Sequence, residues 1–146
     1  MSESDQSPCM AFEIPRGHAV RWPGCDNPET LFIKAERAGK EYIHHYLIQV
    51  SPMKAEGLAL IYVDPEELLF DTGCAPTFEY SNGDDRPDPD IGHIFENAKG
   101  TYLKVIEVPK SQKMFAFVDI TSGKIKRRQE RGVKTVFSCW EVTLEI

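Results

Sequence analysis

Four aspartates lie close together in one polar stretch of the chain and could bind a cation. Their carboxylate oxygens are the ligands that Ca²⁺ prefers, and the residues are Asp84, Asp85, Asp88 and Asp90. The spacing differs from the calcium loop of an EF-hand, because a loop beginning at Asp84 places Arg86 and Pro89 where a ligand and a glycine are needed. We therefore predict a solvated acidic loop, with an irregular metal site at these aspartates as the alternative.

Asp71 is a second candidate for chemistry, because it follows the apolar run Leu68–Phe70 and precedes Thr72 and Gly73. The sequence LLFDTG resembles the catalytic triplet of aspartic proteases, although Cys74 stands where a small Ala or Ser is usual. The resemblance implies two carboxylates that share one proton and activate a water. With one triplet, the chain would act as a dimeric hydrolase with Asp71 as its catalytic residue. The alternative is a turn at a strand end, which these residue types favour.

A third group of residues is basic and lies within residues 124–134. It contains six cations, opposed only by Glu130: Lys124, Lys126, Arg127, Arg128, Arg131 and Lys134. On a hairpin they would form one protruding patch, suited to phosphates, an acidic protein surface or another copy's acidic loop. The alternative is that they protect an exposed sheet edge from aggregation. We predict that this basic hairpin binds a protein partner or a second copy.

The remaining histidines and cysteines form no recognisable motif. The sequence contains no CxxC pair, so the spacing of a zinc ribbon or a thioredoxin-like site is missing. His44 and His45 are adjacent and would point to opposite faces of a strand. Neither of the glycine-rich nucleotide-binding motifs occurs. We therefore expect no cofactor, and a binding protein rather than an enzyme.

Composition and charge limit the class of protein. The chain has 146 residues with 41% hydrophobic and 27% charged residues, which suits one globular domain. Its net charge of −6 disfavours nucleic acid as a partner. The polar start of the chain does not look like a signal peptide, and the longest nearly apolar run, Leu58–Val63, is too short to span a membrane. We predict a cytoplasmic protein with reduced thiols.

The strands that position the candidate residues can be predicted from patterns in the sequence. Residues 101–108, 114–120 and 133–146 are rich in β-branched and aromatic side chains, which is typical of strands. Trp140 is expected to anchor the core. Residues 27–39 fit either a capped helix or the first strand of a hairpin with residues 41–50, and the alternation of Leu31, Ile33 and Ala35 with polar residues favours the hairpin. Asp64-Pro65-Glu66-Glu67 suits the start of a short helix.

Together these patterns predict a mainly β (β-rich α+β) fold, a single antiparallel barrel or sandwich of about seven to nine strands with one or two short helices. Residues 1–9 are expected to be a disordered tail, and residues 10–146 one β-rich domain. We predict a small accessory or binding protein that uses the basic hairpin, residues 124–134, and the acidic loop, residues 84–90. The alternatives are the dimeric aspartic-protease-like hydrolase and a structural subunit of a larger assembly, which would expose an apolar patch.

Overall fold

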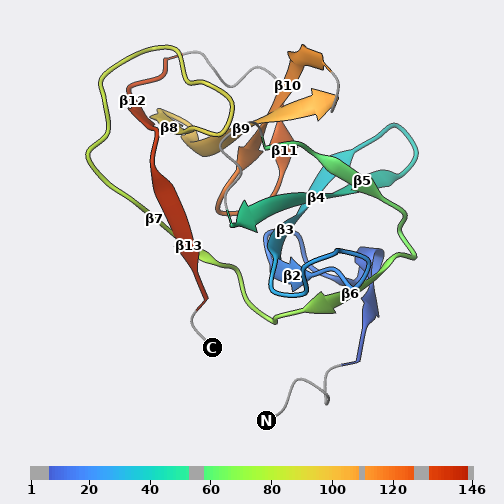
Figure 1. Cartoon of the computed structure of the whole chain (residues 1–146). Coiled ribbons are helices and arrows are strands. Elements are labelled where there is room, and N and C mark those ends of the chain that lie inside the picture. The colour runs from blue at the N-terminus through green and yellow to red at the C-terminus, as the bar shows by residue number, and fades with distance from the viewer. Residues whose placement is uncertain (1–6, 53–57, 109–110, 127–131, 145–146) are drawn as a thin grey trace.

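The computed structural model describes residues 7–52, 58–108, 111–126 and 132–144. In this part of the chain the fold is mainly β, with three antiparallel sheets of six, five and two strands (Figure 1). The predicted β class is confirmed. The prediction of a single barrel or sandwich of about seven to nine strands is not met, because the described residues form 13 strands in three sheets and no closed barrel is detected among them.

The six-stranded sheet combines strands that are distant in sequence. Its spatial order is β1 (Cys9–Met10), β6 (Leu68–Asp71), β2 (Ala19–Arg21), β3 (Leu31–Ala38), β4 (Ile43–Ser51) and β5 (Ile61–Val63). The hairpin of β3 and β4 confirms the interpretation of residues 27–39 as a strand, with the chain reversing around Gly39, whose N–H donates to the Tyr42 carbonyl at 2.9 Å. The strand β6 is inserted between β1 and β2.

The other strands form the five-stranded sheet and a two-stranded ribbon. The five-stranded sheet has the order β11 (Ile125–Lys126), β10 (Ser111–Asp119), β9 (Gly100–Val108), β8 (Ile94–Asn97) and β12 (Thr135–Phe137). The ribbon pairs β7 (Thr77–Tyr80) with β13 (Trp140–Thr143). The strand expected over residues 133–146 is therefore divided, because the chain leaves one sheet after Phe137 and joins the ribbon at Trp140.

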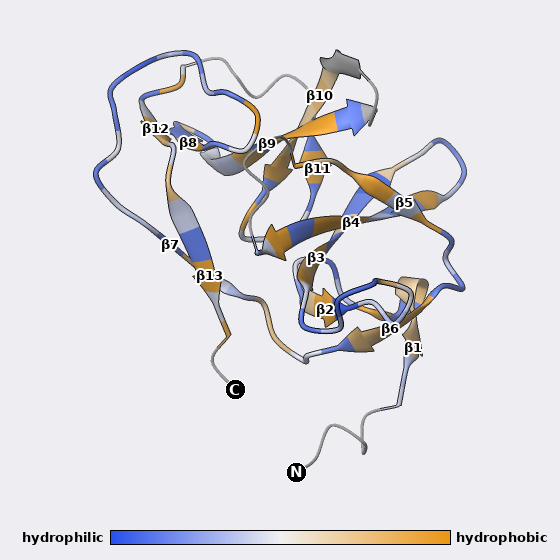
Figure 2. Cartoon of the chain, in the orientation of Figure 1, coloured by the Kyte–Doolittle hydropathy of each residue, from blue (hydrophilic) through white to orange (hydrophobic). Residues whose placement is uncertain are grey.

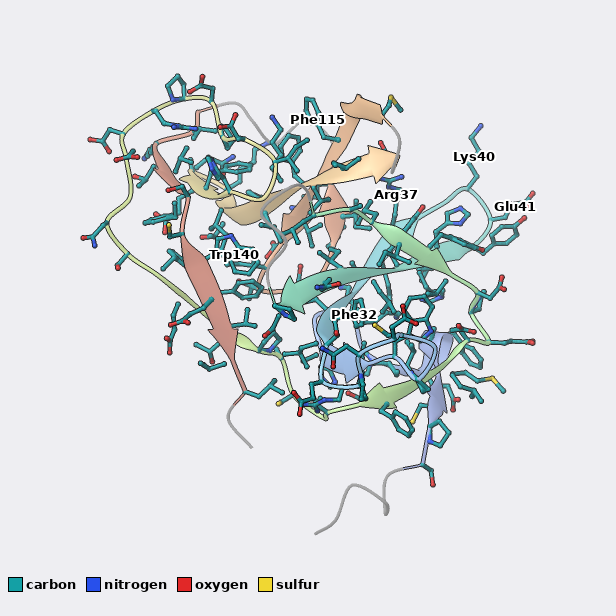
Figure 3. All side chains as sticks on the ribbon, in the orientation of Figure 1. Phe32, Arg37, Lys40, Glu41, Phe115 and Trp140 are labelled. Carbon is teal, nitrogen blue, oxygen red and sulfur yellow. The ribbon has the colours of Figure 1, made fainter. Side chains whose placement is uncertain are left out.

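Two hydrophobic cores use opposite faces of the six-stranded sheet. Ile33 and Ala35 of β3 belong to the main core, which also takes residues from the five-stranded sheet and Trp140 from the ribbon. Phe32 belongs to a second core, which Ala11 and Ile14 help to form. Successive side chains of a strand point to opposite faces, so β3 contributes to both cores. Figure 2 shows hydrophobic and hydrophilic colours alternating along β3 and β4, and Figure 3 labels Phe32 on β3.

A third, smaller core lies on the five-stranded sheet. It consists of four buried side chains, to which Phe115 and Val133 add partly buried contacts: Phe95, Tyr102, Phe117 and Val136. The six- and five-stranded sheets are joined by an ion pair between Arg37 of β3 and Glu107 of β9. Arg37 is labelled in Figure 3.

Two sequence-based expectations about short elements are wrong. Residues 64–67 form a turn in which the Glu67 N–H donates to the Asp64 carbonyl at 3.0 Å. Helix growth stops there because Leu68 begins β6, whose backbone pairs with β1 and β2. The described residues contain no α-helix and one short 3₁₀ helix, η2 (Ala11–Glu13). The run Leu58–Val63 is buried at Leu58, Leu60 and Val63, as predicted. It is not one central strand, because β5 lies at the edge of the six-stranded sheet and Ala59 forms an isolated bridge to Ile106 of β9.

The expected N-terminal tail lies mostly outside the described residues, which exclude residues 1–6. Cys9 begins β1 and pairs with Leu69 of β6. No disulfide joins the four cysteines, all of which lie within the described residues, and Cys139 is exposed.

Candidate functional site

The ribbon of β7 and β13 has two distinct faces. On the inner face, Phe78 and Tyr80 pack against the main core, which contains Trp140. The Phe78 and Trp140 rings have centroids 5.6 Å apart, and the Trp140 indole N–H donates to the Gly92 carbonyl at 2.7 Å. Figure 3 shows Trp140 directed from β13 towards the other sheets, so the predicted role of this residue as a core anchor is confirmed.

The outer face of the ribbon carries two carboxylates directly opposite each other. Glu79 of β7 is in register with Glu141 of β13, and both residues are exposed. Like charges in directly opposite positions destabilise a pair of strands. Within the described residues neither carboxylate forms an ion pair with a cation. The fold therefore maintains an uncompensated pair of negative charges at this position.

A groove of about 820 Å³ adjoins this pair of carboxylates. It lies where the ribbon meets the loop that follows β7, and Asn82 in that loop has a left-handed φ of 57°. The groove combines aromatic rings, hydroxyl and amide groups, a thiol and the two carboxylates: Phe78, Glu79, Tyr80, Ser81, Asn82, Ser138, Cys139, Trp140 and Glu141. We call it the ribbon groove. The two exposed carboxylates suit the cationic head of a Lys or Arg side chain.

The predicted acidic loop continues from the same groove. Asp84 pairs through its backbone with Val136 of β12, with two hydrogen bonds of 2.8 Å. Arg86 places its guanidinium 3.3 Å from the Asp90 carboxylate, and the Asp90 N–H donates to Nδ1 of His93 at 3.1 Å. Burial lowers the pKa of His93. Figure 2 shows the hydrophilic colouring of this long loop between β7 and β8.

The four aspartates named by the sequence do not form a metal site with one another. Asp88 and Asp90 both lie near Arg86, which supplies a positive charge within the loop. The described part of the chain contains no group of three or more His, Cys, Asp or Glu side chains that could hold a metal ion. The acidic loop is braced by protein contacts instead.

The basic segment is described only in part. Lys124 is exposed, and Lys126 places its ammonium 5.7 Å from the Tyr102 ring centroid. The Lys134 N–H donates to the Glu96 carbonyl at 2.9 Å, so this end of the segment is fixed to β8. Arg127, Arg128 and Arg131 lie outside the described residues. Partner binding by the basic segment stays a prediction.

Asp71 lies at the end of β6 and forms a hydrogen bond with a histidine. Its Oδ1 is 3.0 Å from Nδ1 of His18 and accepts the Gly73 N–H at 2.8 Å. The Thr72 hydroxyl donates to the Ala19 carbonyl at 2.7 Å. These contacts brace the triplet as a turn against β2. The shared proton of an aspartic protease would need a second copy to supply the other carboxylate, and this hydrolase stays a prediction.

A buried polar cluster was missed by the sequence analysis. The Lys34 ammonium is fully buried and donates to the Ile14 carbonyl at 3.0 Å and to Glu36 Oε2 at 2.6 Å. His45 of β4 places Nδ1 3.9 Å from the same carboxylate. Burial lowers the pKa of Lys34 and of His45. Alternation places Lys34 on the opposite face of β3 from Ile33 and Ala35, and that face is covered as well.

Comparison with protein families, with curated proteins and with solved structures finds no match to this chain. In the part of the chain that the structure describes, no helical segment combines the length and the apolar character needed to cross a bilayer.

Proposed function

We propose that this chain is a binding protein whose ribbon groove holds an extended, cation-bearing segment of a partner protein. The observation that carries the proposal is the register of β7 and β13, which sets Glu79 directly opposite Glu141 on the exposed face of the ribbon, where both residues line the ribbon groove. A Lys or Arg side chain between the two carboxylates would convert their repulsion into two attractive contacts.

The surroundings of the groove support the same class of partner. Asp84 and Asp85 are exposed and follow Ser81 and Asn82 of the groove wall, so the negative potential extends along the acidic loop. The whole chain carries a net charge of −6. Complementary charge increases the rate at which a partner is captured and selects against acidic competitors.

The first test is a titration with fluorescein-labelled octapeptides. One peptide alternates valine with lysine, and the other alternates valine with glutamine. We expect the lysine peptide to bind more tightly, and its affinity to fall as salt is added, because salt screens exposed charges. Fluorescence anisotropy measures both dissociation constants. Equal affinity for the two peptides would contradict the proposal.

The second test removes the two charges. The double variant Glu79→Gln/Glu141→Gln is expected to bind the lysine peptide at least about tenfold more weakly, a change of about 1.4 kcal/mol. Its matched control is Glu29→Gln/Glu41→Gln, which removes the same charge from two exposed residues outside the groove and should bind like the wild type. Removing the repulsion should leave the free energy of unfolding unchanged or higher, so urea unfolding separates lost binding from lost folding.

A further inference from the structure

A second hollow, which is apolar, lies next to strands β1, β2 and β6 of the six-stranded sheet. Its volume is about 540 Å³, and it shares no lining residue with the ribbon groove. Its walls are mainly proline, aromatic and leucine side chains with two glutamates: Pro8, Trp22, Pro23, Gly24, Glu66, Glu67, Leu68 and Phe70. We call it the Trp22 hollow.

The exposed apolar surface continues beyond the walls of the hollow. Leu68 is 49% exposed, and its in-register partner on β1, Met10, is 37% exposed. Phe12, two residues further along the chain, is 56% exposed. Met10 is paired with Leu68, which lines the hollow, and the Phe12 N–H donates to the Pro65 carbonyl at 3.0 Å, next to Glu66 of the hollow. Exposed apolar residues beside a concave site mark an interaction surface.

Hydrogen bonds hold the hollow in shape without a ligand. The Trp22 indole N–H donates to Glu67 Oε1 at 2.9 Å, and the indole meets the Phe32 ring edge-on, with centroids 5.9 Å apart. The Glu67 carbonyl accepts the Ala11 N–H at 2.8 Å. A preformed site loses less conformational entropy when it binds a ligand.

We infer that the Trp22 hollow is a second docking surface, and that its occupant is an amphipathic segment of a partner protein carrying apolar side chains beside Lys or Arg. Charge selects this occupant. Glu66 and Glu67 line the hollow, and exposed Asp64 lies beside them. A cation next to an inserted apolar side chain would meet these carboxylates.

The same charges argue against two other occupants. A symmetric contact with a second copy would bring identical surfaces together and so place Glu66 and Glu67 near their own counterparts. An anionic membrane surface attracts basic segments, whereas this rim is acidic. The docking surface is separate from the ribbon groove, so the chain would hold two cationic segments at once.

The test uses the whole chain and a fluorescein-labelled, 14-residue amphipathic peptide of leucine and lysine. We expect Phe12→Ser/Leu68→Ser to weaken binding of this peptide at least about tenfold. The matched control is Ile43→Ser/Tyr62→Ser, because Ile43 and Tyr62 are 50% and 56% exposed and lie on β4 and β5. Both double variants change exposed side chains, and urea unfolding confirms that each still folds.

Three results would overturn the inference. Equal weakening by the two serine variants would mean that the peptide binds apolar surface without selectivity. A dimer, seen by light scattering and dissociated by Phe12→Ser/Leu68→Ser, would identify a second copy as the occupant. Binding to phosphatidylcholine vesicles that the same variant abolishes would identify a lipid surface.

Two further variants support the inference or separate it from the proposed function. Glu66→Gln should weaken binding of the leucine–lysine peptide but not of a leucine–glutamine peptide. Glu79→Gln/Glu141→Gln should leave the Trp22 hollow able to bind a leucine–lysine peptide, while it removes binding of the extended lysine octapeptide. A failure at one groove is therefore distinguishable from a failure at the other.

Discussion

At the scale of single residues, the buried polar cluster sets how stability depends on pH. The Lys34 ammonium donates hydrogen bonds to the Ile14 carbonyl and the Glu36 carboxylate. By contrast, Nδ1 of His45 is buried and has no hydrogen-bond partner among the described residues. A buried polar atom without a partner costs about 1–3 kcal/mol. Protonating His45 would place a second cation near Lys34, which further lowers the pKa of this histidine.

We expect the free energy of unfolding to fall as the pH decreases below 6.5, the ordinary histidine pKa. The folded-state pKa of His45 is lowered, so between that pKa and 6.5 the unfolded chain binds the proton and the folded chain does not. Protonation therefore favours the unfolded state. The lowered pKa of His93 acts in the same direction. Urea unfolding between about pH 7 and pH 5 measures the slope.

The control is His45→Leu, which keeps a buried side chain and removes the proton site. Its stability should vary less with pH over the same interval, and the double variant His45→Leu/His93→Leu should vary least. A wild-type slope of the opposite sign would contradict the assignment, as would a slope that the variants leave unchanged.

Residue types in the sequence indicated which side chains could do chemistry, but not which of them meet. A turn at Asp71 was one of the two interpretations of LLFDTG. Its hydrogen-bond partner, His18, could not be predicted, because it lies 53 residues away in the chain. The alternation of Lys34 and Glu36 with apolar neighbours favoured a strand but gave no sign of the buried cluster that they form. Their burial depends on Ile14 and the second core, which cover a face that the alternation alone leaves open.

At the scale of elements, the turn between β10 and β11 fits closely against β3. The Glu36 N–H donates to the Gly123 carbonyl at 3.0 Å, and the Gly17 N–H donates to the Lys34 carbonyl at 2.7 Å. Gly123 has a φ of +74°, and a Cβ there would lie 2.8 Å from the Lys34 carbonyl oxygen and in contact with Gly17. This close approach positions both the turn and the polar cluster beneath it.

We expect Gly123→Ala to destabilise the fold by more than Gly73→Ala. Gly73 has a φ of +85° and open space where its Cβ would be, so its substitution measures the left-handed backbone penalty alone, about 1–2 kcal/mol. Gly123→Ala adds a clash with backbone atoms, which cannot rotate away as a side chain can. Thermal and urea unfolding of both variants give the comparison, and equal losses would contradict the close fit.

Elements that pair with their sequence neighbours could be predicted, because alternation and turn chemistry are local signals. The β3–β4 and β9–β10 hairpins are examples. The short helix expected at residues 64–67 was wrong because a distant contact, the pairing of β6 with β1 and β2, overrides local capping preference. The ribbon groove was not predicted, because its two strands are separated by five others along the chain.

At the scale of the whole molecule, β3 and β4 join the two larger cores. Leu47 of β4 belongs to the second core, while its neighbour Ile48 belongs to the main core. The loss of either core would expose one face of the same two strands. Because the two cores share these strands, we expect the described part of the chain to unfold cooperatively, as small single domains usually do. Cooperative unfolding would also test the prediction of one domain over residues 10–146.

The two tryptophans are natural probes of this cooperativity. Trp22 packs against the second core and Trp140 lies in the main core. The variants Trp22→Phe and Trp140→Phe each retain one tryptophan. Within each variant, we expect the urea midpoint measured by fluorescence to coincide with the midpoint measured by circular dichroism. Separate midpoints would show that the two cores unfold independently.

The pairing of β7 with β13 also sets when the chain acquires its ribbon groove during synthesis. Residue 80 is translated long before residue 140, and until then one wall of the groove is missing. A nascent chain on the ribosome could already hold β3 against β4, yet it would offer no paired glutamates to a lysine-bearing ligand. The proposed capture through this groove would therefore begin only after residue 143 has left the exit tunnel.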